Sequence, residues 1–76
     1  MIVDELLELA KRLSPLHHGM ASIRLLYHPY KGQWEAQASW SDGTTITVAN
    51  DSGDDALFVL RDELLQAVAN TTKGAT

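Results

Sequence analysis

Residues 22–49 read SIRLLYHPYKGQWEAQASWSDGTTITVA, and this stretch decides the fold. Its middle segment, QWEAQASW, alternates polar and apolar side chains, and both tryptophans, Trp34 and Trp40, take apolar positions. Because successive side chains of a β-strand point to opposite faces, the alternation predicts a strand with one buried and one solvated face. The flanking segments 22–28 and 44–49 alternate as well, so the stretch predicts a three-stranded antiparallel meander.

The loop after Trp40 contains Asp42-Gly43, which usually marks a two-residue type I′ turn. Such a loop would place Trp40 opposite Thr45 and slip the apolar sets onto opposite faces. A loop of three residues, 41–43, restores the match, with Gly43 in the left-handed position of a G1 bulge. The predicted pairs are Trp40–Thr44, Ala38–Ile46 and Ala36–Val48.

The same alternation predicts the register of the first hairpin. Its turn is 29–32. Proline at the start of the turn has a fixed φ, and Gly32 at its end can adopt a φ that other residues rarely take. Leu26 then lies on the face opposite the tryptophans. The predicted pairs are Tyr27–Trp34, Leu25–Ala36 and Ile23–Ala38.

One amphipathic helix is predicted on each side of the meander. The first runs over 2–13, where Ser14-Pro15 should end it, because the residue before proline is disfavoured in the helical region. Residues 16–21 are expected to link it to the first strand. The second helix should run from about Gly53 to Ala69, capped by Ser52 with Asp55 in the manner of a capping box.

The second helix has an apolar stripe with polar residues on its other side. Arg61 interrupts the stripe, and we expect its aliphatic stem to lie over the core edge with its charge in water. Val59 should project away from the core. The predicted stripe is Leu57, Leu60, Leu64, Ala67 and Val68, widened by Phe58 and Leu65.

The predicted fold class is therefore α+β, in the order α-β-β-β-α. Both helices should pack on the tryptophan face of the meander and leave its other face open. Residues 1–70 are expected to form a single domain, followed by a disordered tail over 71–76, because the tail is short and polar.

Composition limits the classes of function. The chain has 76 residues, no cysteine and a formal net charge of −4. Nucleic-acid affinity comes largely from Lys and Arg, so this charge argues against general phosphate binding. The acidic, one-sided first segment is typical of neither a signal peptide nor a membrane span, so we expect a cytoplasmic protein with no membrane contact.

No catalytic, cofactor or metal motif is found. There is no nucleophile elbow or Gly-rich phosphate loop, and the histidines His17, His18 and His28 lack a ligand spacing. A core this small also leaves little room for a pocket of several hundred cubic ångströms. We expect a non-enzymatic protein that binds no cofactor and no metal.

The order of elements resembles the double-stranded RNA-binding domain, which has the same α-β-β-β-α plan over a similar length. That resemblance implies contacts from the first hairpin loop, here residues 28–32, to a minor groove. It also implies a lysine cluster at the start of the second helix. Here that stretch is Gly53-Asp54-Asp55-Ala56, so the sign of the charge is reversed.

Charge and exposed apolar residues mark the candidate partner-binding site. An acidic surface can mimic phosphates or dock a basic protein surface. The acids in the first turn of a helix also have a structural explanation, because they suit the helix dipole. The predicted partner-binding residues are Asp51, Asp54, Asp55, Asp62, Glu63, Leu26, Val59 and Tyr30.

The sequence therefore predicts a small acidic protein-binding module. Its size, charge and plan look like small phage-encoded inhibitors of host machinery, including anti-CRISPR proteins. A nucleic-acid binder of the double-stranded RNA-binding type is one alternative. A structural homodimer is another, because the strand edges 23–27 and 44–48 can each pair with another chain.

Overall fold

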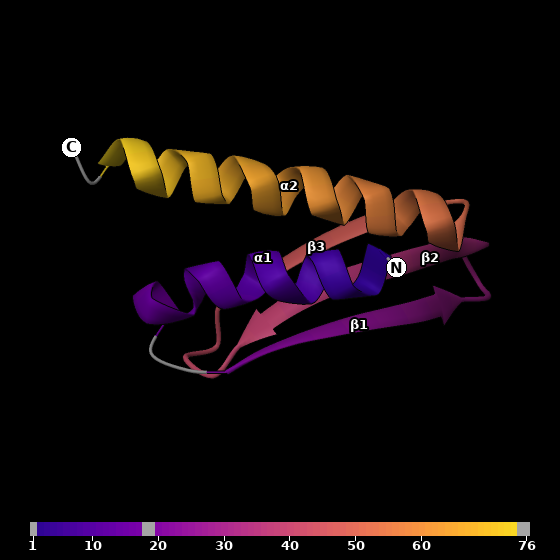
Figure 1. The fold of residues 1–76 in the computed structure, drawn as a ribbon. Coiled ribbons are helices and arrows are strands. Elements are labelled where there is room, and N and C mark those ends of the chain that lie inside the picture. The colour runs from indigo at the N-terminus through magenta and orange to yellow at the C-terminus, as the bar shows by residue number, and fades with distance from the viewer. Residues whose placement is uncertain (1, 18–19, 75–76) are drawn as a thin grey trace.

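A computed structural model describes residues 2–17 and 20–74. Two helices and three antiparallel strands follow in the predicted order, so the α-β-β-β-α plan is confirmed (Figure 1). The strands form one sheet of order β1-β2-β3. The elements are α1 (Ile2–His17), β1 (Ala21–His28), β2 (Gln33–Trp40), β3 (Thr45–Asn50) and α2 (Gly53–Gly74).

Both predicted registers are confirmed. In the first hairpin Tyr27 lies opposite Trp34, and the pairs Leu25–Ala36 and Ile23–Ala38 follow. In the second hairpin Ala38 lies opposite Ile46 and Ala36 opposite Val48. The side-chain period of two leaves only one register that puts the apolar residues of all three strands on one face.

The bulged second turn is also confirmed. The Trp40 N–H donates to the Thr44 carbonyl at 2.9 Å, and the Gly43 N–H donates to the Trp40 carbonyl at 3.0 Å. Gly43 has φ of 92°, and Gly32 in the first turn has φ of 63°. Both glycines thus adopt backbone conformations that other residues rarely take.

The two helices cover the same face of the sheet and run in the same direction (Figure 1). The helices pack against each other; on the sheet, α1 lies mainly over β1, and α2 lies over β2 and β3. Leu6, Leu60 and Leu64 are the largest fully buried side chains. Among the residues whose burial is described, the buried core consists of Leu6, Leu9, Ala10, Leu13, Ala36, Ala38, Trp40, Ala56, Leu57, Leu60 and Leu64.

The helices extend beyond their predicted ends. Pro15, expected to stop α1, lies inside it, and the helix continues to His17. Proline removes only one backbone donor here, close to the end of the helix, and the residue before proline is disfavoured in a helix rather than excluded. At the other end of the chain α2 continues past Ala69 to Gly74, over residues expected in a disordered tail. That tail contains no helix breaker before Gly74, and residues 75 and 76 lie outside the described part.

The predicted helix-covered face is not covered evenly. Trp40 is 4% exposed, and its Nε1–H donates to the Ala10 carbonyl of α1 at 3.0 Å. Trp34 is only partly buried, and it packs on the backbone of Gly53, where an added Cβ would lie 3.3 Å from its ring. Leu25 and Tyr27 share this face but are 40% and 51% exposed. The alternation along the strands correctly predicted the face on which these side chains lie, but not how far they are buried. Their exposure follows because β1 is an edge strand and α1 does not extend over its far end (Figure 1).

Candidate protein-binding surfaces

Three of the predicted acidic residues lie at or just before the start of α2, and all three are exposed: Asp51 in the preceding turn, and Asp54 and Asp55 in the first turn. The predicted cap by Ser52 is present, because its Oγ accepts the Asp55 N–H at 3.5 Å and its carbonyl accepts the Ala56 N–H at 2.9 Å. Negative charge is stabilising at this helix end. Asp54 and Asp55 therefore have a structural role, which does not prevent a second role in binding.

Further along α2, the other predicted residues lie on its outer surface. Asp55, Val59 and Asp62 follow the spacing i, i+4, i+7, which places them on one helix face. Val59 is 37% exposed, and Asp62 and Glu63 are exposed as well. Glu63 lies about 100° further around the helix axis than Asp62. The outer face of α2 thus combines carboxylates with one exposed apolar side chain.

The parallel helices add acidic residues that sequence reasoning did not assign to the site. Asp4, Glu5 and Glu8 lie in the first half of α1, and they line a groove between α1 and α2. The Arg61 guanidinium of α2 lies 3.5 Å from Glu5 Oε2, so this ion pair joins the two helices across the groove. We name the combined set the acidic helix surface: Asp4, Glu5, Glu8, Asp51, Asp54, Asp55, Asp62 and Glu63. Only the arrangement of the helices could reveal its full extent.

The groove is larger than expected, because the small core was predicted to leave little room for a pocket of several hundred cubic ångströms. Its volume is about 570 Å³, and Leu9 and Leu65 supply its apolar lining beside the carboxylates and Arg12. Leu65 and Phe58, predicted to widen the buried stripe, are each 46% exposed. They lie at the flank of α2 that α1 does not fully cover.

Arg61 spans the edge of the core beside this groove. Its guanidinium carbon lies 5.1 Å from the centroid of the Phe58 ring, within range of a cation–π contact. Its Nε is buried and has no hydrogen-bond partner among the described residues. The stem therefore lies over the core edge as predicted, and the charged end forms a solvent-exposed ion pair with Glu5.

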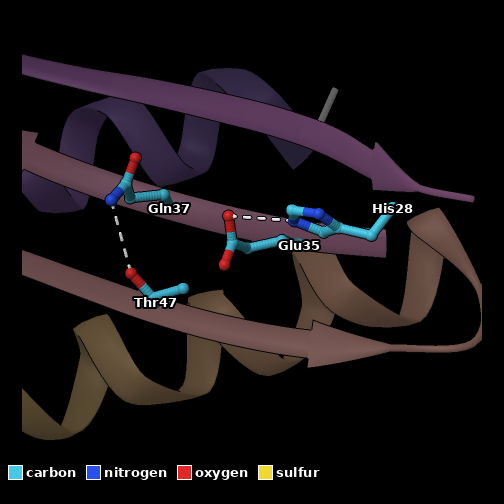
Figure 2. A network of polar contacts seen from close by, with 4 residues as sticks. All are labelled: His28, Glu35, Gln37 and Thr47. Atoms are coloured by element: carbon cyan, nitrogen blue, oxygen red, sulfur yellow. Dashed lines mark hydrogen bonds and ion pairs between the residues drawn. The ribbon is translucent and has the colours of Figure 1, made fainter. Parts of the chain in front are cut away.

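The sheet face away from the helices is polar and carries its own contacts (Figure 2). His28 Nε2 lies 3.3 Å from Glu35 Oε2, and Gln37 Nε2 donates to Thr47 Oγ1 at 3.4 Å. Leu26, opposite Glu35 in the register, is 37% exposed on this face as predicted. The sheet separates Leu26 from the acidic helix surface, so the structure does not bring all predicted site residues together.

Three further exposed side chains lie on β1 and in the turn that follows it. Tyr30, at the tip of the first turn, is fully exposed, as predicted. Leu25 and Tyr27 on β1 were predicted to be covered, so sequence reasoning missed them as surface residues. Their position in an edge strand was the available indication, because an edge strand has no neighbour on one side.

No metal centre and no membrane span is found in the part of the chain that the structure describes. Among residues 2–17 and 20–74, no group of three or more His, Asp or Glu side chains could hold a metal ion. In the same residues no helix is both long and apolar enough to cross a membrane. Of the histidines considered as ligands, His18 and the side chain of His17 lie outside the described part.

Comparison with known proteins identifies no relative. No protein-family model, no curated protein and no solved structure matches this chain. Its function is therefore inferred from the charge and shape of its own surfaces.

Proposed function

We propose that this chain is a non-enzymatic, cytoplasmic protein-binding module that docks a basic partner surface through the acidic helix surface. The observation that carries this proposal is the parallel arrangement of the helices. It places Asp4, Glu5 and Glu8 of α1 along a groove beside α2, and Arg12 and Arg61 are the bases that line this groove. A surface of one sign attracts the opposite sign, and it raises the rate of association more than the final affinity.

The same charges argue for a protein partner over a nucleic acid. The chain has six Lys and Arg residues against ten Asp and Glu residues. Lys11 and Arg12 follow the acidic segment of α1, Arg24 is on β1, and Lys31 is in the first turn. These bases lie on three different elements, whereas duplex RNA requires basic groups along a continuous track.

A partner that itself binds nucleic acid fits this charge pattern best. Carboxylates spaced along two helices present negative charge to a basic groove, as phosphates would. Occupation of such a groove is how a small phage-type inhibitor, including one of the anti-CRISPR kind, acts without chemistry of its own. The exposed apolar residues Val59 and Leu65 supply contact area within the same surface.

The proposal is tested by affinity capture from a host lysate with two double variants that change the net charge equally. Asp55→Asn with Asp62→Asn removes two charges from the acidic helix surface. Glu35→Gln with Asp42→Asn removes two charges elsewhere and serves as the matched control. A captured protein should associate more slowly with the first variant than with the second, and its capture by the parent should weaken as salt shortens the screening length below ~8 Å. Equal association rates for the two variants would contradict the proposal.

A gel-shift assay tests the double-stranded RNA-binding alternative. The parent protein should leave duplex RNA unshifted at near-physiological salt, because it lacks the basic residues that release counterions. A shift that disappears at higher salt would establish the RNA-binding alternative instead.

A further inference from the structure

Alternate residues of β1 direct their backbone hydrogen-bonding groups toward its free edge. The Trp40 N–H donates to the carbonyl of Thr44, the residue directly before β3. The even-numbered residues of β2 therefore bond toward β3 and the odd-numbered ones toward β1. Their partners on β1 are the even-numbered residues, such as Arg24 opposite Gln37. The residues between them direct their backbone N–H and C=O groups outward. These outward-facing residues are Ala21, Ile23, Leu25 and Tyr27.

The side chains of these residues lie on the helix side of the sheet, where coverage is incomplete. Leu25 is 40% exposed even though α1 packs mainly on β1. Val3 of α1 is 43% exposed, and it lies about 200° round the helix axis from Glu5, which faces the groove with α2. Val3 is therefore on the flank of α1 above the free edge of β1. A strand added to this edge would find Val3 and Leu25 beside its inward side chains.

This edge also lacks the features that usually prevent strand addition. Proteins protect edges with proline, charged side chains, bulges or short strands. The eight residues of β1 include neither proline nor lysine, and its pairing with β2 is unbroken from Ala21 to His28. Its one permanent charge is Arg24, which is exposed on the open sheet face. No ion pair of Arg24 with a described residue is found.

A second copy of the chain does not fit this edge well. Two copies paired through β1 would bring their edge strands to about 4.8 Å, with the helices of both on the same side of the sheet. Packed helices require axes about 8 to 10 Å apart. Because α1 lies mainly over β1, the α1 helices of the two copies would overlap. A lone extended segment without a helix has no such conflict.

We infer that the β1 edge binds an extended segment of a partner protein by strand addition. The segment carries apolar side chains opposite Ile23 and Leu25, which turn toward the flank of α1. Between them it carries an acidic side chain opposite Arg24, on the open sheet face. Main-chain hydrogen bonds supply binding, and the alternating side chains supply selectivity, as in other strand-addition complexes. This site lies apart from the acidic helix surface, so it can operate whether or not that surface docks a basic partner.

The probe is a synthetic peptide, TVTVEVTVT, and the readout is amide hydrogen exchange by NMR. In the free protein the outward-facing amides of Ile23, Leu25 and Tyr27 should exchange quickly, whereas the amides of Arg24 and Leu26, bonded to β2, should exchange slowly. Peptide binding should slow exchange at the outward-facing amides alone. Absence of binding, or binding without this alternating protection, would overturn the inference. Protection of the same amides by raising the concentration of the protein alone would assign the edge to a second copy and also overturn it.

Two variants make the test specific. Arg24→Glu should reverse the preference between TVTVEVTVT and its lysine counterpart TVTVKVTVT, each preference being about two- to fivefold, as cross-strand charge pairs allow. An unchanged preference would contradict the assigned register.

Leu25→Pro should abolish peptide binding, because it removes an outward-facing N–H while leaving the bonds to β2 intact. Thr47→Pro is the matched control, since Thr47 faces outward on the other edge, at β3, and its variant should bind the peptide normally. Equal binding by the two proline variants would place the peptide elsewhere.

Discussion

The two ends of the sheet differ in how far the helices cover them, although a tryptophan of β2 lies on the same face at each end. At one end Trp40 is buried under α1 and donates its indole N–H to Ala10. At the other end Trp34, on the same face of the same strand, is only partly buried. Its ring contacts that of Tyr27 in a tilted arrangement, with centroids 4.9 Å apart. We refer to these as the closed end and the open end.

The difference shows that alternation and burial have separate causes. Alternation along a strand decides which face a side chain takes, and both tryptophans obey it. Burial depends on how far the covering helices extend over that face. Both helices begin at the open end (Figure 1). The acidic residues of their first turns therefore lie at the end of the sheet that the helices cover least. Exposed apolar groups and negative charge therefore occur together at one end of the molecule.

The largest effect should come from truncating the two tryptophans. Trp40→Ala should lower the free energy of unfolding by about 3 to 5 kcal/mol, because it creates a cavity and removes the donor to Ala10. Trp34→Ala should cost about half as much, since less of its surface leaves water. Urea melts of the two variants give this comparison. Equal losses would mean that the two ends are equally closed.

The two turns should respond differently to side chains. Gly43→Val at the closed end should cost about 1 to 3 kcal/mol, because φ of 92° strains a β-branched residue. Gly32→Asn at the open end should cost less, since φ of 63° is in the left-handed region that asparagine tolerates. Thermal melts of both variants measure this difference. A neutral valine at position 43 would rule out the bulged turn.

Two serines, one at the start of α2 and one in the last turn of α1, compare the open end with the closed end. Ser52→Ala should cost about 1 kcal/mol, because it removes the acceptor that caps α2. Ser14→Ala should be near neutral, because Ser14 only returns a weak bond to Ala10 at 3.4 Å and alanine favours a helix. Chemical denaturation of each variant checks the order. A larger loss for Ser14 would show that the last turn of α1 depends on this hydroxyl.

The smallest effect is expected on the exposed part of β1. Tyr27→Thr should change the free energy of unfolding by about 0.5 kcal/mol, because half of the ring is already in water and threonine suits a strand. Ile23→Thr is the control closer to the core, and it should cost more. Equal costs would indicate that Tyr27 is covered in solution.

The sequence allowed the strand registers and turns to be predicted, because a single slip would have put Ile46 and Val48 on the wrong face. It did not allow the helix ends to be predicted, since Pro15 disfavours a helix without excluding it. The exposure of Leu25 was also missed, because the alternation along a strand does not indicate how much of the sheet α1 covers. Nor could the candidate site be predicted in full. Glu5 and Glu8 join the acids of α2 only through the parallel packing of the two helices.

The central claim is that the helices close one end of the sheet and leave the other open. Acrylamide quenching of two single-tryptophan variants tests it most directly. Trp34→Phe leaves Trp40 alone, and its emission should be blue-shifted and resistant to quenching. Trp40→Phe leaves Trp34 alone, and its emission should be redder and more readily quenched. Equal quenching of the two variants, or stronger quenching of Trp40, would contradict the claim.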